Sequence, residues 1–424
     1  MSDADLDAYR ARARSWLEAN LEPVGSPRPR ATDVDPGFLA EERRRQRELC
    51  SAGYAGIAWP STYGGQGLSS RHERVFNEEA EGFRTPDFGV LGQTTFGICV
   101  PTMLAHGSPE LLARHVPHVV AGNSLWVQLF SEPDAGSDLA GVRTRATRSG
   151  DRWTVSGSKI WSSGAYFADH GLCLARTSWD VPKHRGLTWF AVPMDAPGVT
   201  IRRLRQITGA SEFCQVFLDG VELTDADVVG EVDAGWSVAR TMLATERGGG
   251  SRGAADAAHP ADALAPDLVA LADGVGRRDD PQVRDLVARA HVADVVMAEL
   301  RSRVIALSRA GVADPGSLAA YVKLAHGTVT PERARIGLQI AGAAALSWPE
   351  GSAAEAATAH AFLAGRSQSI AGGTNEMMRN VIGERLLGLP REHSVDTDVP
   401  FAEVIRRTGA TPAPGQGPSG ECAR

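Results

Sequence analysis

The chain has 424 residues, a length that suits two or three domains. Its hydrophobic content of 43% and charged content of 22% are ordinary for a folded soluble protein. A net charge of −7, without long blocks of like charge, gives no support for binding to nucleic acid or to a membrane surface.

The cysteines and the apolar runs exclude further classes of protein. The five cysteines are far apart and odd in number, and no pair has the CxxC spacing of a zinc site. The first residues are polar, unlike a secretory signal, and no apolar run approaches the roughly 20 residues of a membrane span. We expect reduced cysteines, no metal site and a cytoplasmic protein.

The predicted elements change twice along the chain. Residues 1–125 mix apolar and charged residues at helical spacing. Residues 126–232 consist of short runs of β-branched and aromatic residues separated by turns, which predict a β domain. The helical period returns over 233–392, with a loop expected at 249–270, and residues 393–424 form a tail expected to be partly disordered. The fold class is therefore α+β.

The first chemically informative segment, residues 128–138, reads QLFSEPDAGSD. Such a strand end followed by small and hydroxyl residues suits a ligand site. Gly136 permits close backbone approach, and Ser131 and Ser137 can hydrogen-bond a ligand. The same pattern also describes an ordinary strand-terminating turn.

The second segment, residues 157–165, reads GSKIWSSGA. Trp161 offers a flat stacking surface beside the hydroxyl groups of Ser162 and Ser163, an arrangement that suits a planar heteroaromatic cofactor. Considered alone, a packed core tryptophan is the simpler interpretation.

The third segment, residues 367–392, contains the loop Gly372-Gly373-Thr374 before a predicted helix, with Asn375 as the expected N-cap. Small residues at such a position let a polar ligand approach the start of the helix. An ordinary loop–helix junction would have the same composition.

In their order and spacing, these three segments resemble the acyl-CoA dehydrogenase family. The resemblance implies an N-terminal helical domain, a central small β-barrel domain and a C-terminal four-helix bundle. It also implies bound FAD, oxidation of an acyl-CoA to the trans-2-enoyl-CoA, and an electron-transfer flavoprotein as electron acceptor. The expected assembly is a homodimer or homotetramer, because the family segment that matches 339–343 reaches the FAD of a neighbouring subunit.

The resemblance also carries over individual site residues. The expected FAD contacts are Leu129, Phe130, Ser131, Gly136, Ser137, Trp161, Ser162, Ser163, Gln339, Gly342, Thr374 and Glu376. The expected substrate contacts are Ser137, Arg247 and Gly372.

Three features depart from the family pattern. The Arg-x-x-Phe segment that often binds the FAD diphosphate is absent; the segment GVGRRDDPQV at 274–283 lies nearby, and Arg278 is the substitute considered there. The glycine-rich Gln-Ile-x-Gly-Gly segment reads QIAGA. Gly372 stands where much of the family has its catalytic glutamate.

The reaction needs a carboxylate to remove the α-proton of the thioester, so the base must come from another residue. Trp236, Ala239 and Leu243 mark one face of the helix after the β domain, and Glu246 follows on that face. Some branches of the family place their glutamate here, before an arginine, as in Glu246-Arg247. We predict that Glu246 is the catalytic base; a helix-end salt bridge is the alternative.

Two other functions remain compatible with these residues. A flavin oxidase or monooxygenase of the same fold would use the same cofactor site, and a catalytically silent partner subunit would explain Gly372. The segment GGGSRG at 248–253 matches GxGxxG, but no predicted strand precedes it, so we assign no nucleotide site there.

Overall fold

The computed structural model describes residues 3–24, 36–249, 264–347, 353–394 and 396–408, with only the backbone described at 3–4, 247–249 and 353–355. Two compact units are present. The first comprises 1–206, 210–242 and 393–424, and the second comprises 207–209 and 243–392. The division falls within α7 (Gly235–Gly249), between Met242 and Leu243.

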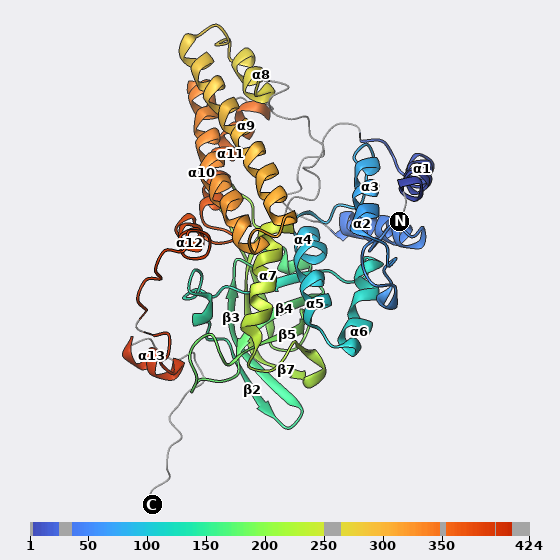
Figure 1. Cartoon of the computed structure of the whole chain (residues 1–424), viewed down its shortest axis with the longest axis vertical. Coiled ribbons are helices and arrows are strands. Elements are labelled where there is room, and N and C mark those ends of the chain that lie inside the picture. The colour runs from blue at the N-terminus through green and yellow to red at the C-terminus, as the bar shows by residue number, and fades with distance from the viewer. Residues whose placement is uncertain (1–2, 25–35, 250–263, 348–352, 395, 409–424) are drawn as a thin grey trace, which may run out of the picture. The chain divides into compact units, whose positions relative to one another are not determined.

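The first unit combines helices with one β-sheet (Figure 1). Its helices before the sheet are α1 (Asp3–Asn20), α2 (Pro36–Ser51), α3 (Ser70–Ala80), α4 (Gly89–Thr94), α5 (Val100–His106) and α6 (Pro109–Val120). Its strands are β1 (Trp126–Leu129), β2 (Arg145–Ser149), β3 (Arg152–Ile160), β4 (His170–Arg176), β5 (Leu187–Pro193), β6 (Val199–Leu204), β7 (Phe213–Thr224) and β8 (Val228–Val229).

The sheet is open, so the expected closed β-barrel is wrong although the α+β class is confirmed. Its strands follow the order β6-β7-β3-β2-β4-β5-β8, and β1 pairs with β4 in parallel. In the described residues β6 and β8 end this path without pairing with each other, which is the physical reason that the sheet does not close.

Gly157 lies at a β-bulge in β3 and packs closely against Thr144. The register between β3 and β7 shifts between Val155 and Gly157. A Cβ atom at Gly157 would lie only 2.4 Å from Oγ1 of Thr144. Only glycine therefore allows β3 to approach the backbone around Thr144 this closely. The bulge lies just before the Lys159–Ala165 segment, whose direction it helps to set.

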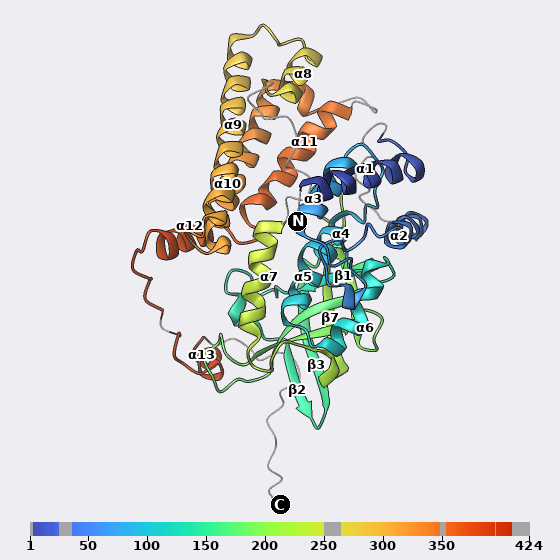
Figure 2. The ribbon, with the colours of Figure 1, turned by 45° about the vertical axis from the view of Figure 1, so that its right-hand side comes forward.

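The second unit is helical, as expected for the C-terminal part of the chain. Besides the end of α7, it contains α8 (Pro266–Gly274), α9 (Pro281–Arg309), α10 (Pro315–Ala341), α11 (Ala353–Gly365) and α12 (Asn375–Val381). The long helices α9 and α10 run side by side in both views (Figures 1 and 2). Part of the loop expected at 249–270 is instead the start of α8, and residues 250–263 lie outside the described residues.

Several helix starts follow from short sequence signals. Ser108, Asp280 and Asp314 each precede a proline and accept a hydrogen bond from a backbone N–H in the first turn, at 3.1, 2.9 and 2.9 Å. The side chain satisfies a donor that the helix leaves unpaired, and proline is already shaped for the first helical position.

A buried aromatic cluster joins α6 to the sheet. The ring of His115 lies 5.0 Å from Trp126 and 4.8 Å from His170, edge-on to both, while Trp126 stacks on His170 at 4.9 Å. Burial, together with the charge of His170, lowers the pKa of His115 to about 3. Burial also lowers the pKa of His170. Both rings are therefore neutral in the folded protein near neutral pH.

Acid should destabilise the protein through this cluster. Both histidines take up protons near pH 6.5 when unfolded but resist protonation when folded, so stability falls as the pH drops below 6.5. The unfolding free energy of the wild type falls when the pH is lowered from about 6.5 to about 4.5. We expect this fall to be about 1–2 kcal/mol smaller in His115→Phe. Urea unfolding at a series of pH values measures this, with exposed His360→Phe as the control. Equal pH slopes for the wild type and His115→Phe would contradict the assignment.

Candidate active site

The SEPDAGSD and KIWSSGA segments meet in the first unit. The backbone N–H of Ile160 donates to the carbonyl of Ser131 at 2.9 Å, and Nζ of Lys159 donates to the carbonyl of Phe130 at 3.1 Å. Lys159 also pairs with Glu132 at 2.8 Å. These contacts bring the predicted flavin-lining residues of both segments to one place.

The pair between Lys159 and Glu132 lies in the protein interior, with side-chain exposures of 0% and 7%. Glu132 also accepts hydrogen bonds from the backbone N–H groups of Arg143 at 2.6 Å and Thr144 at 2.9 Å. Burial opposes ionisation of Glu132, but the charge of Lys159 and these hydrogen bonds hold its pKa below the usual range. Glu132 therefore favours its ionised form, and its contacts fix three chain segments together.

Trp161 has an unusual conformation for a tryptophan. Its φ is 65°, its side chain is 58% exposed, and its ring lies edge-on to Phe213 at 5.7 Å. A positive φ costs free energy at a non-glycine residue, and such strain often marks a functional position. The arrangement presents an exposed aromatic face, as expected of a stacking surface and unlike a packed core tryptophan.

Two buried polar atoms near the junction have no hydrogen-bond partner within the described residues. They are Oγ of Ser162 and Nε2 of Gln128, although the backbone N–H of Ser162 donates to Cys214 O at 3.0 Å. Buried polar groups normally have a partner, and a cofactor with a polar edge supplies one. The residues present therefore fit a flavin.

The other predicted flavin contacts of this unit have different surroundings. Leu129 is fully buried in the sheet core, so its side chain has no free face for a ligand. Phe130 is 9% exposed and packs on Trp189 at 5.3 Å, and Ser163 is half-buried. Ser131 is half-buried, whereas Gly136 and Ser137 are exposed on the loop that follows.

The exposed loop is joined to the C-terminal part of the chain. Nζ of Lys183 lies 3.0 Å from the carboxylate of Asp138 and 2.7 Å from that of Asp396. A short helix, α13 (Phe401–Arg407), follows, and buried Phe401 lies under the guanidinium of Arg176 at 3.8 Å. The tail prediction missed this helix, and residues 409–424 lie outside the described residues.

In the second unit, Glu246 and Gly372 are neighbours. Gly372 has a φ of +67°, and a Cβ atom built on it would lie 3.6 Å from Oε1 of Glu246 and 3.3 Å from Cε of Lys323. The half-buried Glu246 carboxylate therefore lies beside the point from which a side chain at position 372 would start. Arg247, predicted to contact substrate, has a side chain outside the described residues.

The loop after Gly372 differs from expectation in one detail. Thr374, not Asn375, is the N-cap of α12, and its hydroxyl accepts from the backbone N–H of Met377 at 3.2 Å. Thr374 has extended backbone angles, as an N-cap requires, whereas Asn375 is already helical. The predicted FAD contact Glu376 is 77% exposed and pairs with Arg379 at 3.2 Å.

The end of α10 carries the QIAGA segment, which departs from the glycine-rich pattern of the family. An arginine that sequence reasoning passed over binds this segment. Arg277 donates to the carbonyls of Gln339 and Ile340, both at 2.9 Å. Gly342, with a φ of 58°, follows directly, and Arg278 is exposed and paired with Asp273 at 3.0 Å. Arg277 thus stabilises the segment, while the exposed side chain of Gln339 points away from the buried face of α10.

Other chemistry has no comparable site in the part of the chain that the structure describes. No group of three or more His, Cys, Asp or Glu side chains there is arranged to hold a metal ion. No helix among these residues is both long and apolar enough to cross a bilayer.

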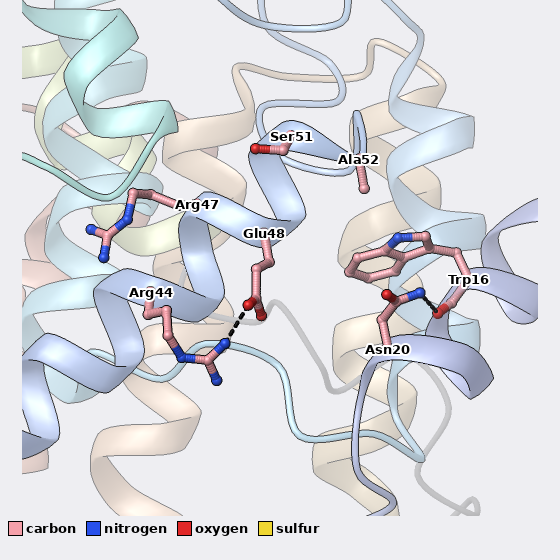
Figure 3. Close-up of a pocket in the computed structure, with 7 residues that line it drawn as sticks. All are labelled: Trp16, Asn20, Arg44, Arg47, Glu48, Ser51 and Ala52. Carbon is pink, nitrogen blue, oxygen red and sulfur yellow. Dashed lines mark hydrogen bonds and ion pairs between the residues drawn. The ribbon is translucent and has the colours of Figure 1, made fainter.

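A surface pocket of about 440 Å³ lies between α1 and α2 (Figure 3). Arg44 pairs with Glu48 there, and Asn20 donates to the carbonyl of Trp16 at 2.8 Å. These polar groups bind one another, so the pocket offers no set of converging unpaired donors and belongs to neither predicted site.

Comparisons with known proteins agree with this geometry. Three family models cover most of the chain: the acyl-CoA dehydrogenase N-terminal domain at 3–123, the middle domain at 128–221 and the C-terminal domain at 233–387. The chain belongs to the acyl-CoA dehydrogenase family, so the family and the enzyme class predicted from the sequence are confirmed.

Among curated relatives, the acyl-CoA dehydrogenase IpdE1 of Mycobacterium tuberculosis is 35% identical over 92% of this chain and 99% of its own length. FadE34 of the same organism is 38% identical over 90% of this chain, which spans only 51% of that protein. Among solved structures, the Tcur3481-Tcur3483 steroid acyl-CoA dehydrogenase has a TM-score of 0.70 and 28% identity, over 92% of this chain and 99% of the matched chain.

The residues that sequence reasoning missed are Glu132, Lys159, Lys183 and Arg277. A signal was present for the first two, because each lies inside a recognised motif. Their pairing joins positions 27 residues apart, which the spacing of residues alone does not reveal.

Loss of the buried lysine should weaken both the fold and the cofactor site. Lys159→Met leaves Glu132 ionised and unpaired in the interior, so we expect about 3–5 kcal/mol lower unfolding free energy and lower flavin content. Chemical unfolding and the flavin-to-protein absorbance ratio measure these effects. The control is Arg152→Met, which breaks the exposed pair to Glu222 in the same sheet and should change stability by less than about 1 kcal/mol. Similar stability losses in both variants would contradict the special role of the buried pair.

Proposed function

We propose that this chain is an FAD-dependent enzyme that oxidises the Cα–Cβ bond of an acyl-CoA to the trans-2-enoyl-CoA, with Glu246 as the base. The observation that carries the proposal is the Glu246 carboxylate, 3.6 Å from the Cβ position of Gly372. A carboxylate is thus supplied at the place that Gly372 leaves without a side chain.

Each residue has a defined task in this proposal. FAD, when bound, supplies the acceptor for the hydride that leaves Cβ. Trp161 and the Ser162–Ser163 pair hold and orient the flavin, and the exposed Ser137 loop contacts the phosphate groups of the ligands. One carboxylate oxygen of Glu246 takes the proton from Cα, while Gly372 leaves room for that carboxylate.

The same observation weakens one of the two alternatives, and reactivity with O₂ tests the other. A silent partner subunit was suggested by the missing glutamate at position 372, and the nearby Glu246 removes that reason. An oxidase or monooxygenase would use the same flavin contacts but would react rapidly with O₂ in its reduced state. We propose an electron-transfer flavoprotein as acceptor, so reduced flavin should be reoxidised slowly by O₂.

The substrate and the assembly are proposed from relatives. One solved relative is the Tcur3481-Tcur3483 steroid acyl-CoA dehydrogenase, and another is the ChsE4-ChsE5 complex of Mycobacterium tuberculosis. Each of these designations pairs two protein names. We propose a CoA thioester with a bulky, steroid-like acyl group, and an oligomer in which the 339–343 segment contacts a neighbouring subunit. Anaerobic titration with straight-chain, branched and steroid-type thioesters, together with sedimentation, tests both proposals.

Glu246→Gln should retain FAD and bind the thioester but reduce its flavin at least about 100-fold more slowly. The amide has nearly the shape of the carboxylate but cannot take the α-proton. Anaerobic stopped-flow absorbance measures flavin reduction. Glu332→Gln is the control, because this carboxylate lies on α10 of the same unit, pairs with Arg335 and is not among the predicted site residues. If Glu246→Gln reduced its flavin at the wild-type rate, Glu246 would not be the base and Glu376 would be the next carboxylate to test.

Trp161→Ala should raise the dissociation constant for FAD by roughly 3- to 10-fold and alter the flavin spectrum, because it removes the exposed stacking face. Ser163→Ala should shift the spectrum with a smaller loss of affinity. Flavin fluorescence during reconstitution measures both. Trp16→Ala, in the α1–α2 pocket, is the control and should bind FAD like the wild type. A folded wild-type protein that failed to bind FAD would disprove the cofactor assignment itself.

A further inference from the structure

The loop between α11 and α12 is attached to α10 at two points one helical turn apart. Nζ of Lys323 donates to the carbonyl of Gln368 at 2.7 Å. At Gly327, the carbonyl oxygen accepts from Oγ of Ser369 at 2.8 Å and from Nδ2 of Asn375 at 3.2 Å. Both ends of the segment that contains Gly372 are thus held by one helix.

Gly327 makes the second attachment possible. A Cβ atom at this position would lie 2.2 Å from Oδ1 of Asn375 and 2.9 Å from the carbonyl oxygen of Gln368. No side chain fits at such distances, so the loop can lie directly on the backbone of α10 only at a glycine. The position of Gly372 is therefore set by specific contacts and not by the loop alone.

The first attachment reaches the proposed base. Cε of Lys323 and Oε1 of Glu246 lie 3.3 and 3.6 Å from one point, the Cβ position of Gly372. These two atoms are therefore at most about 7 Å apart, with the Cβ position of Gly372 close to both. The charge of Lys323 also acts on its surroundings, because burial and Lys323 together lower the pKa of His326 one turn further along α10.

We propose that Lys323 is a positioning residue for Glu246, fixing the 368–375 loop beside the carboxylate and keeping that carboxylate ionised. This inference rests on the proposed function, in which Glu246 is the base. A cation within a few ångströms favours the charged form of a carboxylate, and only that form accepts the α-proton. The hydrogen bond to Gln368 directs the lysine stem past Gly372 and so determines where the cation lies.

Other charged groups on the surrounding elements are differently placed. Glu376 is exposed and paired with Arg379, and Asp314 caps the start of α10 by accepting from Ser317 N. Other titratable groups on the described parts of these elements include His326, Arg366 and, on α7, the exposed Arg240; Arg301 on α9 acts on His326, and the side chain of Arg247 lies outside the described residues. Arg366 lies over the ring of Phe362 at 5.0 Å. Lys323 is therefore the cation whose position the loop itself specifies.

The pH dependence of flavin reduction tests the proposal in the FAD-loaded, full-length protein. Without the cation, the base becomes protonated at higher pH, so activity is lost earlier on acidification. In Lys323→Met, the acid limb of the profile of rate against pH should move to a higher pH by about 1 unit. Flavin reduction at pH 7 should be about 10-fold slower. Lys323→Arg retains the charge and a donor for Gln368 and should recover most of the rate and the wild-type acid limb.

Two further measurements separate a positioning role from a merely structural one. The flavin spectrum and melting temperature of each variant report folding, and Arg335→Met removes an ion-paired cation from the same helix without approaching the loop. Arg335→Met should leave the acid limb unchanged. If Lys323→Met were too unstable to load FAD, Lys323→Arg and Lys323→Gln would be compared, and an unshifted acid limb in Lys323→Gln would overturn the proposal.

Failure of this inference is distinguishable from failure of the proposed function. A wild-type rate in Glu246→Gln would remove the base assignment and with it the role of Lys323. An inactive Glu246→Gln combined with a wild-type pH profile in Lys323→Met would leave Glu246 as the base and overturn the role of Lys323 alone.

Discussion

The proposed flavin site in the first unit depends on one buried ion pair, between Lys159 and Glu132. It joins the end of β1 to the end of β3, and Glu132 additionally holds the backbone that enters β2. Burying two charges is expensive, and an apolar pair of similar size would often be as stable. The pair instead imposes geometry, because its hydrogen bonds are satisfied in only one arrangement of these three segments. That arrangement brings Trp161 next to the SEPDAGSD loop.

A second constraint governs the helical unit, where glycines determine what can lie near Glu246. Gly372 leaves space for the carboxylate, and Gly327 lets the loop lie on α10. A glutamate at position 372 would place a second carboxylate beside Glu246, and two like charges so close resist simultaneous ionisation. The absence of a side chain at position 372 and the presence of the Glu246 carboxylate on α7 are thus complementary, because only one carboxylate occupies this place. The proposed base thus lies on a helix, whereas position 372 lies on a loop.

Local signals in the sequence predicted most of this fold, whereas long-range pairing lay beyond them. Helices that begin at Ser108-Pro109, Asp280-Pro281 and Asp314-Pro315 follow from capping rules that act within one turn. Closure of the sheet depends instead on whether β6 and β8 meet, which no local pattern specifies. The motifs pointed to Trp161 and Glu246 as candidate site residues. The pairing of Lys159 with Glu132, 27 residues away, and the approach of Lys323 and Glu246 to Gly372 emerge only from the folded chain.

The C-terminal segment provides another set of contacts between distant parts of the chain. Lys183 bonds both Asp138, next to the predicted ligand contact Ser137, and Asp396, which lies 213 residues further along the chain. Arg176 donates to the carbonyls of Ala140 and Val142 and covers Phe401. These two cations add polar contacts to a loop that is otherwise anchored by its buried Ala135 and Leu139. Both cations also contact residues 396–401, so this loop is connected to a segment that no local pattern in the sequence places beside it.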